Sequence, residues 1–291
     1  MALSSPDQID PPLPHCLDIG RRVLALDLDG TVLGTDFSLP ELTTTVIQAV
    51  QRGGTQVVIA TGRTFRSARI VAGSMSLSGP MITHQGAQIR DIASGHALFS
   101  TTIPLESARD VLAELADEDA TTTVYLDDVI YVSHLTPQLE RFRTNTGAEI
   151  RVVGPLAQGI ASAPTKIVVN GDAERLDAIT SRLRARFDGR LKVAKSWPIF
   201  LEIAAAGVSK AAALRFLAAH QGFMSEDVIA FGDSAIDIDM LEWAGMGVAV
   251  ASAPEEVRRA ADRLCGTVEE QGVAHFLLDL AGVRLPLGDH A

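Results

Sequence analysis

The sequence predicts an α/β fold in which a parallel sheet core is interrupted by an inserted α+β domain. Short, fully apolar segments alternate with amphipathic stretches over 21–86 and again over 205–291, as in buried parallel strands joined by crossover helices. In residues 87–204, strand-like segments are instead separated by tight turns, which is typical of antiparallel pairing. We therefore expect a core formed by 21–86 with 205–291 and a second domain at 87–204.

The first part of the core is expected to begin with a strand and a capped helix. Ser38-Leu39-Pro40-Glu41 has the residue spacing of a capping box and precedes the first helix. Val46, Ile47 and Val50 form the apolar stripe of that helix, and Gly53-Gly54 ends it. The other elements predicted here are a helix over 64–75 and strands at 23–26, 56–60 and 81–83.

The inserted domain carries a clear hairpin signal. Apolar strands at 121–126 and 129–132 are separated only by Asp127-Asp128, which predicts a tight turn between them. The other elements expected in this domain are helices over 105–116 and 173–187 and strands at 166–169 and 191–193. Beyond it the core pattern resumes, with helices over 209–220 and 240–243 and strands at 228–231 and 247–250.

Composition and charge exclude several classes of protein. With 47% hydrophobic and 21% charged residues, the chain has the composition of an ordinary soluble protein. Its net charge of −11 disfavours nucleic acid and anionic membranes as partners. Residues 1–20 contain Asp7, Asp10 and several prolines rather than a signal peptide, so we expect a disordered tail. Cys16 and Cys265 lack the spacing of a metal site, which predicts free thiols in a reducing cytoplasm.

Chemistry is expected where the apolar strands end, because ligands of open α/β sheets bind beyond the carboxyl ends of the strands. Asp27 and Asp29 follow the first strand and precede Gly30, which permits a sharp turn. A polar strand-end turn would also explain the two aspartates. A calcium-binding EF loop is excluded, because Val32 occupies the position that requires glycine.

Two further positions could bind an anion. Thr61-Gly62-Arg63 offers a hydroxyl and backbone N–H groups at the start of a predicted helix. Lys210 lies in the first turn of the helix predicted at 209–220, where a positive charge opposes the helix dipole. An anionic ligand would explain that lysine. Taken singly, an unliganded threonine cap and a solvated lysine are the alternatives.

The strand at 228–231 leads to two more carboxylates, Asp233 and Asp237. If Asp27, Asp29 and Asp233 converge at one sheet edge, their charges need a counter-ion, because close carboxylates raise one another's pKa. Mg²⁺ fits best, since it accepts carboxylate, water and phosphate oxygens together. The sequence therefore predicts a magnesium site at this edge.

Other catalytic motifs are missing from the sequence. It contains no G-x-S-x-G or H-E-x-x-H motif, and Ser209 stands where a Walker loop has glycine before its lysine. The seven histidines show no metal-ligand spacing. His84, beside the end of the strand at 81–83, is the histidine with a candidate role.

Together these motifs resemble the haloacid dehalogenase-like superfamily, and their order resembles its Cof-type sugar-phosphatase branch, over about residues 21–280. Asp27-Leu28-Asp29-Gly30-Thr31 is similar to the DxDGT motif of that family, which implies that Asp27 is the nucleophile and Asp29 the general acid/base. The resemblance also implies a Rossmann-like core, with 87–204 as an inserted cap that determines substrate specificity.

The resemblance further assigns the residues that bind ligands. The implied phosphate-binding residues are Thr61, Gly62, Arg63 and Lys210. The implied metal-binding residues are Asp27, Asp29, Asp233 and Asp237, with Asp237 behind the direct ligands. Ile236, Gln85 and Ser252 depart from the family pattern, because asparagine is common at all three positions. Losing an amide that bonds a charged group costs about 1.5–3 kcal/mol, or about 10- to 150-fold in rate.

The resemblance implies a Mg²⁺-dependent phosphatase that hydrolyses small phosphomonoesters, such as sugar phosphates, through an aspartyl-phosphate. The partner is then a small phosphorylated metabolite, with no nucleic acid and no membrane involved. Two alternatives stay open. One is a catalytically weakened phosphosugar-binding or sensing protein, for which Ile236 is the main argument. The other is phosphotransfer as in the related phosphomutases.

Overall fold

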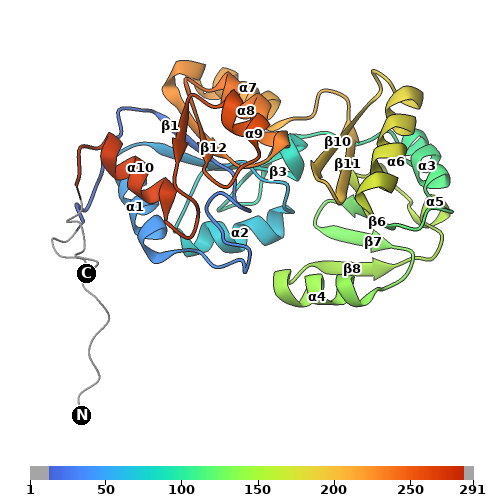
Figure 1. Ribbon diagram of the computed structural model, residues 1–291. Helices are drawn as coiled ribbons and strands as arrows, with labels where there is room; N and C mark the ends of the chain where they lie inside the picture. The colour runs from blue at the N-terminus through green and yellow to red at the C-terminus, as the bar shows by residue number, and fades with distance from the viewer. Residues whose placement is uncertain (1–12, 285–291) are drawn as a thin grey trace, which may run out of the picture.

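The computed structural model describes residues 13–284, which form two lobes (Figure 1). One lobe contains both ends of the described chain, and we call it the core. The other lobe comes from the middle of the chain, from about residue 103 to residue 205, and we call it the cap. This arrangement confirms the predicted α/β fold with a parallel sheet core. The cap has its own sheet together with helices, as expected for an inserted α+β domain.

The core is built on a parallel sheet with the strand order β14-β13-β12-β1-β2. Its strands are β1 (Val23–Leu26), β2 (Gln56–Ile59), β12 (Val228–Gly232), β13 (Met246–Val250) and β14 (Arg263–Cys265). The central strand β1 pairs with β2 on one side and with β12 on the other, and each of its residues is buried. Burial on both faces explains why β1 is an unbroken apolar run without polar alternation.

Helices flank this sheet. They are α1 (Glu41–Arg52), α2 (Phe65–Ser74), α7 (Lys210–Gln221), α8 (Ile238–Trp243), α9 (Glu255–Ala260) and α10 (Gly272–Leu280). The capping box predicted for α1 is wrong, because Pro40 occupies the N-cap position and makes no side-chain cap bond. The Ser38 hydroxyl instead donates to Asp36 Oδ1 at 2.6 Å, which closes a tight turn ahead of the helix.

A small antiparallel sheet extends the core beyond the predicted boundary at residue 87. It consists of β3 (Pro80–Thr83), β4 (Gln88–Asp91) and β5 (Ala97–Ser100). Ile89 and Ile92 are buried in the core cluster, whereas Ile103 belongs to the cap cluster. The expected start of the inserted domain was therefore too early, because the antiparallel pattern begins inside the core.

The expectation of a disordered tail over residues 1–20 fails for its second half. Leu17 and Ile19 are buried in the core cluster. The backbone N–H of Leu17 also donates to the carbonyl of Ala49 in α1, at 2.9 Å. Residues 13–20 are thus packed onto the core, while residues 1–12 lie outside the described part of the chain.

The cap contains a six-stranded sheet with the order β10-β11-β9-β6-β7-β8. Its strands are β6 (Thr121–Leu126), β7 (Val129–Val132), β8 (Glu149–Val152), β9 (Lys166–Asn170), β10 (Leu191–Trp197) and β11 (Phe200–Ala205). Its helices are α3 (Leu105–Glu114), α4 (Pro137–Thr146), α5 (Leu156–Gly159) and α6 (Ala173–Arg186). The antiparallel pair β6–β7 confirms the predicted hairpin.

The turn of this hairpin docks the cap on the core. Asp128 Oδ1 accepts a 2.8 Å hydrogen bond from the backbone N–H of Arg66 near the start of α2, and Asp128 Oδ2 lies 3.2 Å from Arg90 NH1. Gln88 Nε2 donates to Asp127 Oδ1 at 2.8 Å. The polar turn that the sequence marked as a hairpin thus also holds the two lobes together.

Two smaller findings concern the sequence expectations. Cys16 and Cys265 are both unpaired, the first exposed and the second buried, as expected for free thiols. Within residues 13–284, no helix combines the length and the apolar character that crossing a membrane requires.

Candidate active site

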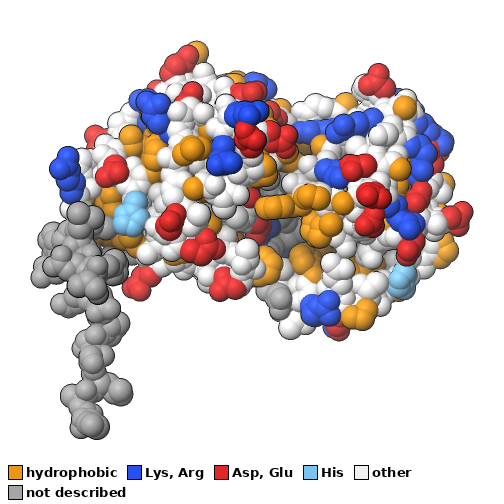
Figure 2. Space-filling model, viewed as in Figure 1, with side chains coloured by type: hydrophobic (Ala, Val, Ile, Leu, Met, Phe, Trp, Pro, Cys, Tyr) orange, Lys and Arg blue, Asp and Glu red, His pale blue; other side chains and the backbone are white. Residues whose placement is uncertain are grey.

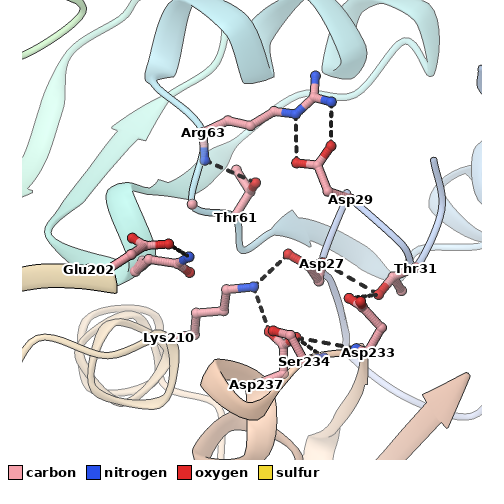
Figure 3. A network of polar contacts seen from close by, with 12 residues as sticks. Asp27, Asp29, Thr31, Thr61, Arg63, Glu202, Lys210, Asp233, Ser234 and Asp237 are labelled. Carbon is pink, nitrogen blue, oxygen red and sulfur yellow. Dashed lines mark hydrogen bonds and ion pairs between the residues drawn. The ribbon is translucent and has the colours of Figure 1, made fainter. Parts of the chain in front are cut away.

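Two neighbouring parallel strands bring distant carboxylates together at one sheet edge (Figure 3). Leu26 at the end of β1 pairs with Phe231 in β12, and Asp27 and Asp233 lie just beyond these residues. Oxygen atoms of Asp27, Asp233 and Asp237 lie within 4.8 Å of one another, and all three residues are buried. The predicted convergence of Asp27 and Asp233 therefore appears in the structure.

Lys210 supplies the positive charge of this cluster. Its Nζ lies 2.5 Å from Asp27 Oδ1 and 2.5 Å from Asp237 Oδ1, and its side chain is 2% exposed. Burial alone would lower the pKa of Lys210, but the attraction of Asp237 and Asp27 outweighs it and raises that pKa. The lysine is therefore a buried ammonium. Lys210 is the first residue of α7, whose N-cap is Ser209, and from this position its side chain reaches the carboxylates.

Asp237 is held by its own loop. Its Oδ2 accepts hydrogen bonds from the backbone N–H of Asp233 at 3.2 Å and from the backbone N–H and hydroxyl of Ser234 at 2.9 and 2.8 Å. Because its other oxygen faces Lys210, Asp237 positions the lysine and the loop. Asp27 and Asp233 are left as the carboxylates best placed to bind an ion.

Gly30 and Thr31 shape the space beside these carboxylates. Gly30 has a φ of +85°, and a Cβ there would lie 2.5 Å from Asp233 Oδ2, so only glycine lets the two segments approach. Thr31 Oγ1 lies 3.1 Å from Asp233 Oδ1 and 3.4 Å from Asp27 Oδ2. The sequence prediction did not single out Thr31, although it lies within the Asp27–Thr31 motif.

The charge balance of the cluster favours a cation. Burial raises the pKa of Asp233, and the nearby Asp27 and Asp237 raise it further. Burial also raises the pKa of Asp27, against the opposing effect of Lys210. Buried carboxylates that repel one another, with a single lysine between them, fit a hard divalent cation that prefers oxygen ligands.

The carboxylate of Asp29 lies outside this acidic cluster, and its predicted part in metal binding stays a prediction. It forms a bidentate ion pair with Arg63, whose Nε and NH2 lie 2.8 and 2.5 Å from its two oxygens. The Asp29 side chain is 45% exposed and lines the cavity described below. The guanidinium accounts for this orientation, because planar forks bind carboxylates in this way.

The loop between β2 and α2 carries the other predicted phosphate-binding residues. Thr61 is buried, and its Oγ1 accepts a hydrogen bond from the backbone N–H of Arg63 at 3.2 Å. Gly62 and Arg63 line the cavity next to Asp27 and Asp29. Thr64 caps α2 through a 3.3 Å bond from Ser67 N, so the loop leads directly into a helix N-terminus.

A cavity of about 270 Å³ lies between the core and the cap, and Figure 2 shows the hollow between the lobes. Asp27, Asp29 and Lys210 line its core side, and Lys166 and Glu202 line its cap side. Glu202 was missed by the sequence analysis, although a lone acidic residue within the apolar strand Phe200–Ala205 was a usable signal.

The basic side chains of the cap differ in their environments. Lys166 is buried and faces the cavity. Lys195 instead forms an ion pair with Asp177 at 2.6 Å, and Arg143 pairs with Glu140 within the exposed face of α4. Neither Lys195 nor Arg143 lines the cavity, so Lys166 is the basic residue of the cap that can contact a ligand there.

The three departures from the family pattern have different surroundings. Ile236 is buried beside Asp237, and Ser252 is exposed. Gln85 lines the cavity and donates to Glu202 Oε1 at 3.0 Å, which links the core to the cap. Lys210 forms its buried ion pairs with Asp27 and Asp237 although residue 236 is an isoleucine and carries no amide.

A family profile described as haloacid dehalogenase-like hydrolase matches residues 24–277, which span both the core and the cap. The chain belongs to the haloacid dehalogenase-like hydrolases. Among curated relatives, it is 33% identical over 267 residues to the 5-amino-6-(5-phospho-D-ribitylamino)uracil phosphatase YitU of Bacillus subtilis, covering 88% of this chain and 96% of the relative. The HMP-PP phosphatase of Klebsiella pneumoniae is 29% identical over 258 residues, covering 88% and 94% of the two chains.

Solved structures agree with this assignment. A structure of a haloacid dehalogenase-like hydrolase from Bacteroides thetaiotaomicron has a TM-score of 0.81 at 27% identity, covering 89% of this chain and 99% of that one. A structure from Thermotoga maritima has a TM-score of 0.76 at 31% identity, covering 89% and 97%. These comparisons confirm the predicted Cof-type haloacid dehalogenase-like hydrolase and the enzyme class, a phosphoric monoester hydrolase.

His84, the histidine with a predicted role, is fully buried near the site. Among residues 13–284, neither of its ring nitrogens has a hydrogen-bond partner. Burial lowers its pKa to about 3, with further lowering by Lys166 and Arg90. It is therefore a neutral ring in the folded protein over the ordinary pH range, packed edge-on against Tyr125.

We expect His84 to make the protein acid-sensitive. Its pKa is lower in the folded than in the unfolded chain, so its stabilising contribution is complete above pH 6.5 and declines as the pH falls towards 3. Below pH 6.5, protonation of His84 in the unfolded chain should cost the parent protein about 1.4 kcal/mol in the free energy of unfolding per pH unit. His84→Phe should not show this loss. Urea unfolding between about pH 7 and pH 4.5 measures this slope.

The control for this experiment is His96→Phe at an exposed position, which should retain the pH slope of the parent protein. His84→Asn repeats the test with a residue that tolerates the positive φ found at this position. Parallel pH curves for the parent and both His84 variants would contradict the prediction.

Proposed function

We propose that this hydrolase removes phosphate from small phosphomonoesters through an aspartyl-phosphate on Asp27, with Mg²⁺ as its cofactor. The observation that carries the proposal is the position of Asp27. It is a buried carboxylate at the sheet edge, held by Lys210, next to Asp233 and open to the cavity. A nucleophile with a fixed orientation and a cationic neighbour suits attack on a phosphoryl group.

Asp27 and Asp233 would hold the metal ion. When bound, Mg²⁺ supplies positive charge that stabilises the phosphoryl oxygens during transfer. Asp237 keeps Lys210 and the loop at Asp233 in place through its hydrogen bonds. Lys210 contributes a further positive charge beside Asp27 Oδ1.

The covalent steps are assigned to Asp27 and Asp29. A carboxylate oxygen of Asp27 forms a bond to phosphorus while the bond from phosphorus to the alcohol oxygen breaks, and Asp29 in its protonated form donates its proton to that oxygen. Asp29, now a carboxylate, accepts a proton from the water that attacks the aspartyl-phosphate. This water releases inorganic phosphate and restores Asp27.

The phosphate-binding loop would orient the substrate. Thr61 and the backbone N–H groups of Gly62 and Arg63 lie at the start of the segment that leads into α2, where anions are favoured. An incoming phosphate dianion competes with Asp29 for the Arg63 guanidinium. Substrate binding thereby frees the acid/base carboxylate.

The proposed substrates are small phosphorylated metabolites, with sugar phosphates as the first compounds to test. The named relatives act on a phosphorylated ribitylaminouracil and on HMP-PP. A cavity of about 270 Å³ is slightly below the about 300–1,000 Å³ of typical ligand pockets, which suits a small substrate. The net charge of −11 argues against a nucleic-acid partner, and the two unpaired thiols support a cytoplasmic location.

Phosphate release from a panel of sugar phosphates, with Mg²⁺ and with excess chelator, tests the proposal. We expect release with Mg²⁺ and almost none with chelator. Binding of the sugar phosphates without release under both conditions would instead support the phosphosugar-sensing alternative. Exchange of phosphate between sugar positions without net release would support a mutase.

A further inference from the structure

Phe37 combines two features that are each unfavourable on their own. Its side chain is 45% exposed, although burial of a large apolar ring would be stabilising. Its backbone has a φ of +63°, in the left-handed region that a residue with a bulky side chain rarely adopts. Such strain persists where the surrounding structure enforces it, and it is concentrated at functional sites. Phe37 also lines the cavity together with Asp29 and Arg63.

The turn that carries Phe37 is closed by its own hydrogen bonds. The backbone N–H of Phe37 donates to the carbonyl of Gly34 at 2.9 Å, and the N–H of Gly34 donates to the carbonyl of Ser38 at 3.0 Å. Asp36 Oδ1 accepts from the backbone N–H of Ser38 at 2.9 Å and from its hydroxyl at 2.6 Å. These bonds hold the backbone of Phe37 in its left-handed conformation. The turn therefore fixes the direction in which this side chain leaves the backbone.

The ring of Phe37 contacts the guanidinium of Arg63. Arg63 Cζ lies over the ring, 5.3 Å from its centroid, which is within the range of a cation–π contact. The same guanidinium binds Asp29 through Nε and NH2, at 2.8 and 2.5 Å (Figure 3). The ring attracts the charge of the guanidinium and offers no hydrogen-bond acceptor in its plane. Phe37 therefore does not compete with Asp29 for the two bonding N–H groups.

Arg63 has to change partners during the proposed reaction. In the free protein it binds Asp29, and an incoming phosphate dianion competes for the same N–H groups. A long arginine side chain has many rotamers, so it could turn away from the cavity when its ion pair breaks. A ring that attracts the cation without taking its N–H groups can retain the guanidinium during this exchange. Phe37 is suited to that task because the turn fixes its own position.

We propose that Phe37 is a positioning residue that acts through Arg63: its ring keeps the guanidinium at the cavity wall while the N–H groups pass from Asp29 to the substrate phosphate. This inference rests on the proposed function, because it adds a residue to the phosphate side of the same site. The strained backbone and the exposed ring are then explained by a contact that serves catalysis rather than folding.

Substitutions of Phe37 test this role. Phe37→Asn removes the ring and introduces a residue that tolerates a positive φ. With Mg²⁺ present, we expect its kcat/KM to fall by about 2- to 30-fold, the range that corresponds to one cation–π contact. The loss should be equal for β-glycerophosphate and p-nitrophenyl phosphate, because Phe37 acts on the phosphate side. Phe37→Tyr keeps the face of the ring and should retain the parent value, whereas Phe37→Leu should lose activity as Phe37→Asn does.

A double-mutant cycle separates this role from a structural one. Arg63→Met removes the guanidinium, and in that background Phe37→Asn should change kcat/KM no further. The melting temperature of Phe37→Asn should be no lower than that of the parent protein, since relief of the strained backbone offsets the lost contact. The matched control is Met224→Asn, at an exposed position with an ordinary φ of −107° and outside the cavity lining, which should leave kcat/KM unchanged.

The outcomes also distinguish this inference from the proposed function. Phosphate release by the parent protein with an unchanged kcat/KM in Phe37→Asn would overturn the role of Phe37 and leave the phosphatase intact. The inference also fails if the loss is undiminished in the Arg63→Met background, and a lower melting temperature would then show a purely structural role. A loss confined to p-nitrophenyl phosphate would overturn it as well, since the ring would then contact the substrate. No release from either compound by the parent protein would overturn the proposed function and this inference with it.

Discussion

Asp27→Asn is expected to abolish phosphate release while the protein stays folded. The amide has nearly the same shape as the carboxylate and can still contact Lys210, but it cannot act as the attacking nucleophile. Loss of the covalent nucleophile in another hydrolase lowers kcat by about 10⁶-fold, and we expect a loss on this order here. Phosphate release under saturating substrate and Mg²⁺ measures it.

The matched control is Asp188→Asn, which makes the same chemical change at an exposed position of the cap. This variant should keep full activity. Circular dichroism of both variants should match that of the parent protein. An Asp27→Asn variant that releases phosphate at the parent rate would show that another group is the nucleophile.

Magnesium is expected to raise the melting temperature of the protein, because a bound cation relieves the repulsion between the buried Asp27 and Asp233. At a free Mg²⁺ concentration of about 100 times Kd, the folded state gains about 2.7 kcal/mol. With an unfolding entropy of about 2.1 cal/mol/K per residue, that corresponds to a rise of about 4 °C for a chain of 291 residues. Thermal melting followed by circular dichroism, with and without MgCl₂, measures the shift.

Asp233→Asn tests whether this shift comes from the proposed site. The variant keeps an oxygen and the approximate shape but loses the charge, so most of the Mg²⁺-dependent shift should disappear. Asp188→Asn should keep the full shift, and KCl at equal ionic strength should give none. An undiminished shift in Asp233→Asn would place the stabilising ion elsewhere.

The sequence was sufficient to predict those parts of the site that depend on strand ends. Asp27 and Asp233 both follow fully apolar strands, and parallel strands of one sheet end at the same edge. Their meeting could therefore be inferred without coordinates. Lys210 was also detectable, because a lysine in the first turn of a helix opposes the helix dipole and needs an explanation.

Other parts depend on contacts that sequence spacing does not encode. The pairing of Asp29 with Arg63 could not be predicted, because the long Arg63 side chain can reach several partners. The cap side of the cavity was missed because Glu202 and Trp197 come from a second sheet, whose placement over the core is set by tertiary contacts.

The errors in the fold have a similar origin. The composition of residues 13–20 predicts disorder, whereas the side chain of Leu17 is buried against the core. The antiparallel pattern after residue 87 predicts a domain boundary there, whereas β4 and β5 form a small sheet with β3 in the core. Composition and periodicity report local preferences, and only the packed structure shows which lobe an element joins.

The central position of β1 in the core sheet delays folding of the core during translation. β1 pairs with β12, so Val23 can pair with Val228 only after Val228 has left the ribosome. The centre of the core sheet therefore forms late in translation. Until then the apolar nascent strand has one open edge, at which foreign strands can add. Lys210 and Asp237 emerge in the same late stretch. A polypeptide released early, with the cap already synthesised, would therefore have an incomplete core sheet and would lack Lys210 and Asp237.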